Sequence, residues 1–169
     1  MSNVTENEYL CRLEVVGIGA TDGSETYESV KKNFMSESCC NPYPDFIRYG
    51  IVFSGVAPGA DIAVDELVKD GTFRDFLGST PEELECRRML GSQFVKLCRE
   101  HPDKLSQERG HPAFVVLTEN DESVVSDLSN VFIVFVDVRF GNLCLFVSGL
   151  NYLPTWYAED HHRILYLKQ

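Results

Sequence analysis

Apolar and polar residues alternate along several short stretches of the chain, and these stretches predict β-strands. Residues 9–19 alternate and then become apolar, which is typical of a strand that enters a core. Further strands are expected at 47–53, 112–118, 131–138 and 143–147. Because only the turn at 140–142 separates the last two strands, they are expected to pair as a hairpin.

Other stretches repeat their apolar residues at intervals of three and four, which predicts amphipathic helices. This spacing occurs over 26–35, 62–68 and 84–98. The last helix has a clear start, because Thr80 can cap it, Pro81 occupies its first position and two glutamates follow. It is expected to end at 101–102, where a proline stops it. Loops are predicted at 20–25, 38–44 and 70–79, and an acidic turn or short helix at 120–129.

The order of these elements predicts the fold class. The early strands alternate with helices, whereas the last strands pair locally. This order favours an α/β fold of two or three layers, with a sheet that is parallel in its N-terminal half and carries an antiparallel hairpin toward the C-terminus. The alternative is an α+β fold with a wholly antiparallel sheet. A chain of 169 residues suits a single domain at 9–169 after a flexible acidic tail at 1–8.

The charge and the cysteines restrict the partners and the compartment. The formal net charge is −11 at pH 7, so DNA, RNA and anionic membranes would be repelled and are not expected as partners. A basic protein partner is compatible with this charge. The polar N-terminal residues do not form a signal peptide, and six cysteines without a secretory signal indicate reduced thiols. A cytoplasmic or nuclear location is therefore expected. The chain has no C-x-x-C pair, so a zinc finger is not expected.

No metal site is predicted from the sequence. The adjacent pair His161 and His162 is the densest group of metal-type ligands, but neighbouring side chains on an extended backbone point to opposite faces. A solvated turn near the C-terminus is the expected setting for this pair, because histidine ligands need spaced partners that converge from a scaffold.

The clearest candidate for ligand chemistry is Ser54-Gly55-Val56-Ala57-Pro58-Gly59-Ala60-Asp61, between a predicted strand and a predicted helix. A helix that begins just beyond a strand directs free N–H groups and the positive end of its dipole at one point, where an anion is stabilised. In a parallel sheet this loop shares an edge with the loop after the first strand. The predicted ligand-binding residues are Gly17, Gly19, Asp22, Ser54, Gly55, Gly59 and Asp61.

The same segment resembles the S-G-G-A-x-G-A-D element of the SLOG superfamily, which comprises Rossmann-like nucleotide-binding domains such as the LOG phosphoribohydrolases and DNA-processing protein A. The resemblance covers about residues 11–70, and Gly17-x-Gly19 with Asp22 stands where the family has its first nucleotide-facing loop. Val56 replaces the family's second glycine, and the later P-G-G-x-G-T element with its catalytic glutamate has no counterpart. The resemblance implies a binder of a nucleotide-like small molecule with weak or no catalysis, and it leaves the cofactor undefined.

A second hypothesis is a non-enzymatic protein-interaction module, an adaptor or inhibitor with an acidic surface and aromatic anchors. Tyrosine and tryptophan on irregular segments commonly anchor interfaces, although the same residues also seal the edge of a small core. The candidate anchors are Phe73, Phe76, Tyr152, Trp156 and Tyr157. The ligand hypothesis requires a concave polar pocket at 19–22 and 54–61. The interaction hypothesis requires those loops to be filled and Trp156 to be exposed.

Overall fold

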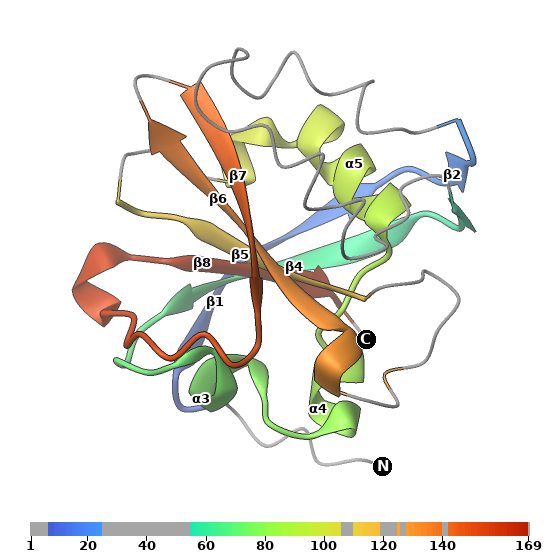
Figure 1. Ribbon diagram of the computed structural model, residues 1–169. Helices are drawn as coiled ribbons and strands as arrows, with labels where there is room; N and C mark the ends of the chain where they lie inside the picture. Colours follow the sequence, from blue (N-terminus) through green and yellow to red (C-terminus); the bar gives the residue numbers. More distant parts are fainter. Residues whose placement is uncertain are drawn as a thin grey trace.

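The computed structural model describes residues 7–24, 55–105, 110–118, 125, 128–139 and 142–168, and its centre is one six-stranded sheet (Figure 1). The strand order is β1 (Leu10–Ile18), β4 (Ala60–Leu67), β8 (Arg163–Leu167), β5 (Ala113–Thr118), β6 (Val131–Arg139) and β7 (Asn142–Gly149). A ribbon of β2 (Thr21–Asp22) and β3 (Val56–Ala57) extends the β1–β4 pair. The helices are α3 (Phe73–Leu77), α4 (Pro81–Glu85) and α5 (Gly91–Glu100), with 3₁₀ turns η2 (Pro102–Lys104), η3 (Leu128–Asn130) and η4 (Ala158–Asp160).

The predicted α/β fold, with a sheet that is parallel in its N-terminal half, is wrong. Within the described ranges every neighbouring pair of strands in the main sheet is antiparallel except β5 and β8, and the N-terminal strands β1 and β4 form an antiparallel pair. The sheet is therefore mixed and mostly antiparallel, and three short α-helices accompany it in this part of the chain. The described part of the chain has no Rossmann-like arrangement.

The error has its origin in residues 62–68, which are strand β4 and not a helix. Ile62 and Val64 face the core beneath α5, whereas Leu67 belongs to the core on the other face of the sheet. A strand that is buried on both faces is apolar without a strict alternation, so its spacing mimics that of a helix. Its β-branched residues favour the strand.

Other predicted elements are confirmed. The strands expected at 9–19, 112–118 and 131–138 correspond to β1, β5 and β6, and the predicted hairpin is the antiparallel pair β6–β7. The predicted helix 26–35, loop 38–44 and strand 47–53 lie outside the described residues, and 120–129 is described only at 125, 128 and 129. The predicted loop at 70–79 contains α3.

The helix start at Thr80 is also confirmed. The backbone N–H of Glu83 donates to Thr80 Oγ1 at 3.3 Å, and the backbone N–H of Thr80 donates to Glu83 Oε2 at 3.1 Å, which forms a capping box. The expected single helix is divided, however, into α4 and α5. Between them the backbone N–H of Met89 donates to the carbonyl of Val116 in β5 at 3.1 Å, so this segment bonds to the sheet instead of continuing the helix.

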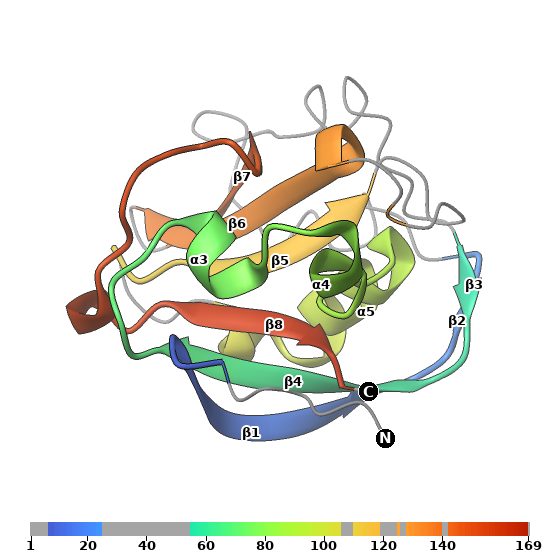
Figure 2. The same cartoon turned by 90° about the horizontal axis from the view of Figure 1, so that it is seen from below.

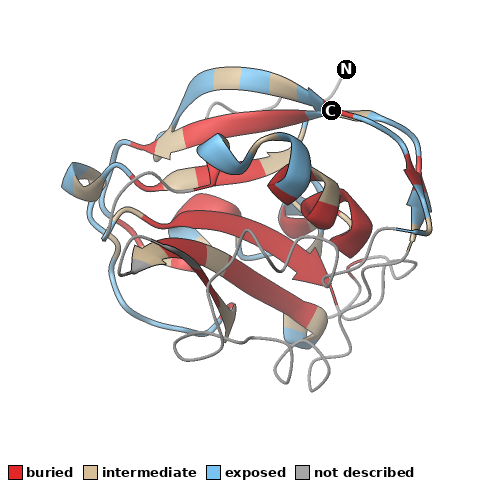
Figure 3. Cartoon of the chain, turned by 90° about the horizontal axis from the view of Figure 1, so that it is seen from above, coloured by how far each residue is buried: buried red, intermediate tan, exposed pale blue. Residues whose placement is uncertain are grey.

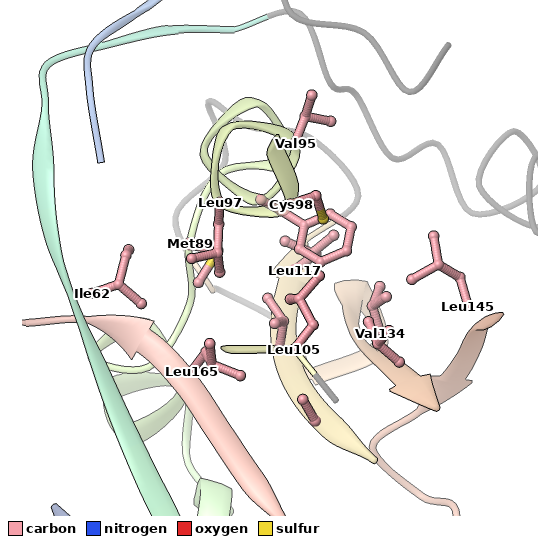
Figure 4. Packing of buried hydrophobic residues seen from close by; sticks show 14 of the residues in the cluster. Ile62, Met89, Val95, Leu97, Cys98, Leu105, Leu117, Val134, Leu145 and Leu165 are labelled. Atoms are coloured by element: carbon pink, nitrogen blue, oxygen red, sulfur yellow. The ribbon is translucent and has the colours of Figure 1, made fainter. Parts of the chain in front are cut away.

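Apolar side chains are buried on both faces of the sheet. Figure 4 shows the core beneath α5, where Leu97 and Cys98 of the helix approach Leu117 and Leu165 of the strands. The second core lies under α3 and α4 and contains Phe73, Phe76, Leu84, Phe114 and Ile133. The central strands are buried and β1 is largely exposed or intermediate (Figure 3). The residues between β7 and β8 cross the edge of the second core.

Candidate functional site

The structure brings six of the seven predicted ligand-binding residues near one another, as the paired strands of a ribbon. Gly17 lies opposite Asp61 in the β1–β4 pair, and Asp22 lies opposite Val56 in the β2–β3 pair. Gly19 and Gly59 lie in the short segments between these strands, Gly55 directly precedes β3, and Ser54 is outside the described residues. Because Gly59 is followed by a strand, the anion site expected at a helix N-terminus does not form here.

The polar groups of this ribbon already bind groups of the protein. The backbone N–H of Gly19 donates to Glu100 Oε2 of α5 at 2.9 Å, and the nearby Lys96 Nζ is 3.6 Å from the other oxygen of the same carboxylate. Asp22 Oδ1 accepts the backbone N–H of Ser24 at 2.9 Å. A phosphate at Gly19 would meet the Glu100 carboxylate, and like charges repel. These contacts disfavour an anionic ligand at the ribbon.

We therefore expect nucleotides, nucleotide sugars and cyclic dinucleotides to leave the melting temperature of the protein unchanged. A ligand at one hundred times its Kd would stabilise the fold by about 2.7 kcal/mol, which raises Tm by several degrees at this size. The measurement is a thermal-shift screen at neutral pH. A saturable rise in Tm with any of these compounds would contradict the expectation.

Two of the five candidate aromatic anchors belong to the core. Phe73 and Phe76 are 0% exposed, and their ring centroids lie 5.2 Å and 5.9 Å from that of Phe114 in β5. They lie in α3 and are not available to a partner in this fold. The third, Trp156, is half-buried, with its ring centroid 4.8 Å from that of Phe114. Tyr152 and Tyr157 are exposed.

Residues 151–157, which we call the strap, run along the outside of the molecule from the end of β7 toward η4 (Figure 2). Trp156 and Gly71 bond to each other through both backbone groups, with N–H to carbonyl distances of 2.8 Å and 3.1 Å. Just beyond the strap, the backbone N–H of Ala158 donates to Asp70 Oδ1 at 2.8 Å. At its start, Arg74 Nη2 donates to Asn151 Oδ1 at 2.5 Å. The strap is therefore fixed at both ends.

The fixed strap exposes three large side chains. Tyr152, Leu153 and Tyr157 are 47%, 78% and 51% exposed. Tyr152 also lies over the rings beneath, with its centroid 6.2 Å from that of Phe73. Leu153 was not among the sequence candidates, although an apolar residue directly before Pro154 in an irregular segment is a signal that could have identified it.

A buried histidine lies directly beneath the strap. His162 is 1% exposed, and its ring meets the rings of Trp156 and Phe114 at centroid distances of 5.2 Å and 5.5 Å. Neither of its ring nitrogens, nor Trp156 Nε1, makes a hydrogen bond with a residue that the structure describes. The expectation of a solvated turn holds for His161, which is exposed, but is wrong for His162. Among the described residues there is no group of three potential metal ligands.

Comparisons of the chain with family models, with curated proteins and with solved structures find no match. None of the helices in the described ranges combines the length and the apolar character needed to cross a bilayer. Functional inference therefore depends on the residues themselves.

Proposed function

We propose that the chain is a non-enzymatic protein-interaction module and that the strap is its contact surface. The observation that carries the proposal is the exposure of Tyr152, Leu153 and Tyr157 on a segment whose backbone is fixed at both ends. A contact surface that is already ordered loses little conformational entropy when a partner binds. Tyrosine adds contact area at a low entropic cost because its side chain has few rotatable bonds.

The charges around the strap favour a basic partner. Three exposed acidic residues lie near the strap. Asp70 and Asp75 lie on either side of Gly71, which pairs with Trp156, and Glu159 follows the strap. Arg74 and Lys69 offset part of this local charge, but the chain as a whole carries −11. Attraction between opposite charges accelerates the encounter of two proteins, and salt weakens this attraction. We therefore propose a basic protein surface as the partner, with an apolar group that packs on Leu153.

Replacing Leu153 by serine is expected to weaken partner binding at least tenfold, about 1.4 kcal/mol, because an anchor at the centre of an interface contributes this much or more. The stability of the protein should change by no more than about 0.5 kcal/mol, since the side chain is 78% exposed. The measurement is affinity capture with the wild-type protein and the variant as baits, compared protein by protein.

Val56→Ser is the matched control, because Val56 is 76% exposed but lies on the β2–β3 ribbon. A partner of the strap should be retained by this control and lost with Leu153→Ser, and its capture should fall as salt is raised. If both variants retain the same proteins as the wild type, or both lose them equally, the strap is not the contact surface.

A further inference from the structure

Trp156, which anchors the strap, packs against the imidazole of His162, a side chain that can change its charge. Trp156 fixes the strap to the molecule, and its indole forms a T-shaped contact with the imidazole of His162 at an interplanar angle of 86°. The imidazole is almost wholly buried between Trp156 and Phe114, and neither of its nitrogens forms a hydrogen bond within the described ranges. A neutral ring suits this apolar setting, whereas an imidazolium would lose its hydration, and burial outweighs the favourable contributions of the nearby Asp160 carboxylate and the Pro112 backbone.

Three other titratable groups act electrostatically on His162, and they come from separate parts of the chain. Asp160 of η4 has its Oδ2 atom 3.5 Å from His162 Nε2, and its backbone carbonyl contacts Nδ1 of His111, which precedes β5. Asp137 of β6 accepts the backbone N–H groups of Gly110 and Val138 at 3.0 Å and 2.9 Å. The two carboxylates and the backbone of Pro112 favour the imidazolium, and His111 opposes it. Burial has the largest influence and lowers the pKa of His162 below its usual value of 6.5.

We propose that protonation of His162 detaches Trp156 and releases the strap, so that the contact surface is assembled at neutral pH and dismantled in acid. The consequence for a partner rests on the function proposed above. The release itself does not, because it is a property of the isolated protein.

The direction follows from proton linkage. In the docked state the pKa of His162 is depressed, whereas in a released state its ring meets water and titrates near 6.5. Below that pH the released state binds more protons than the docked state, so acid favours release. As the pH falls below 6.5, the ratio of released to docked molecules rises by up to tenfold for each pH unit. The rise stops when the pH reaches the pKa of His162 in the docked state.

Trp156 is the only tryptophan of the chain, so its fluorescence reports directly on the anchor. The experiment measures quenching by acrylamide from pH 8 to pH 5, together with far-UV circular dichroism. We expect the quenching constant to rise severalfold in acid, with a midpoint below pH 6.5 and an unchanged dichroism spectrum. His162→Phe should remove the transition. His161→Asn is the matched control, because His161 is exposed, has a left-handed backbone (φ 51°) that asparagine tolerates, and should not affect the transition.

The proposal is overturned by constant quenching across this range, by a transition that persists in His162→Phe, or by loss of secondary structure over the same pH interval. Should His162→Phe fail to fold, an NMR titration of the histidines in the wild-type protein decides the matter, and a pKa of His162 above 6.5 overturns the proposal. These measurements need no partner. If capture fails but the quenching transition is clear, only the proposed contact surface is refuted. If capture succeeds but the transition is absent, only the proposed release of the strap is refuted.

Discussion

Replacing Phe114 by alanine is expected to lower the free energy of unfolding by about 3–5 kcal/mol. The ring is 0% exposed and lies at the centre of the second core, with centroid distances of 4.8 Å to Trp156 and 5.2 Å to Phe73. Its removal leaves a cavity beneath the strap and deprives several aromatic rings of their edge contacts. Urea denaturation followed by circular dichroism measures the change. Because small domains have about 5–15 kcal/mol of stability, this loss is a large fraction of the total.

Tyr157→Ala provides the comparison for this prediction, because Tyr157 is an aromatic residue of the strap that is 51% exposed. Its loss should change stability by about 0.5 kcal/mol or less, as is usual at the surface. A loss below about 1 kcal/mol for Phe114→Ala would mean that the site collapses around the smaller side chain, and would contradict the central position assigned to this ring.

The elements that could be predicted from the sequence are those with local signals. The helix start at Thr80 was predictable because a hydroxyl cap, a proline and a glutamate lie within four residues. Strand β6 was predictable from a continuous apolar run of strand length. The hairpin followed from the short turn alone. Each of these features depends on neighbours that are close in the chain.

Features that depend on distant residues were not predictable. The break between α4 and α5 requires the carbonyl of Val116, which no pattern within 80–100 indicates. Phe73 and Phe76 are core residues although their segment is rich in glycine, because β5 supplies the ring of Phe114 against which they pack. His162 is buried for the same reason, since the strap covers it. Residues in contact across the sheet decide these outcomes.

Asp65 shows the same limit for a charged residue. It lies within the stretch 62–68, whose spacing predicts a helix. In the structure it is 4% exposed in strand β4. Its carboxylate accepts a hydrogen bond from Nε–H of Arg12 in β1. The hydroxyl of Tyr166 in β8 donates a second hydrogen bond to its Oδ2 at 2.5 Å. These two partners are 53 and 101 residues away in the chain, so nothing local indicates the pair.

Asp65→Ala is expected to cost about 2–3 kcal/mol of stability. Removing one partner of a buried ion pair costs about 3–5 kcal/mol when the other charge is left without compensation, but the side chain of Arg12 is 42% exposed and water would relieve part of this loss. Urea denaturation of the single variants and of the double variant with Arg12→Ala measures the coupling, which we expect within 0.5–3 kcal/mol. If Asp65→Ala and Arg12→Ala are instead additive, the carboxylate is held by Tyr166 alone. In that case Tyr166→Phe, and not Arg12→Ala, should reproduce the loss, because the phenol hydroxyl is the remaining donor to Asp65.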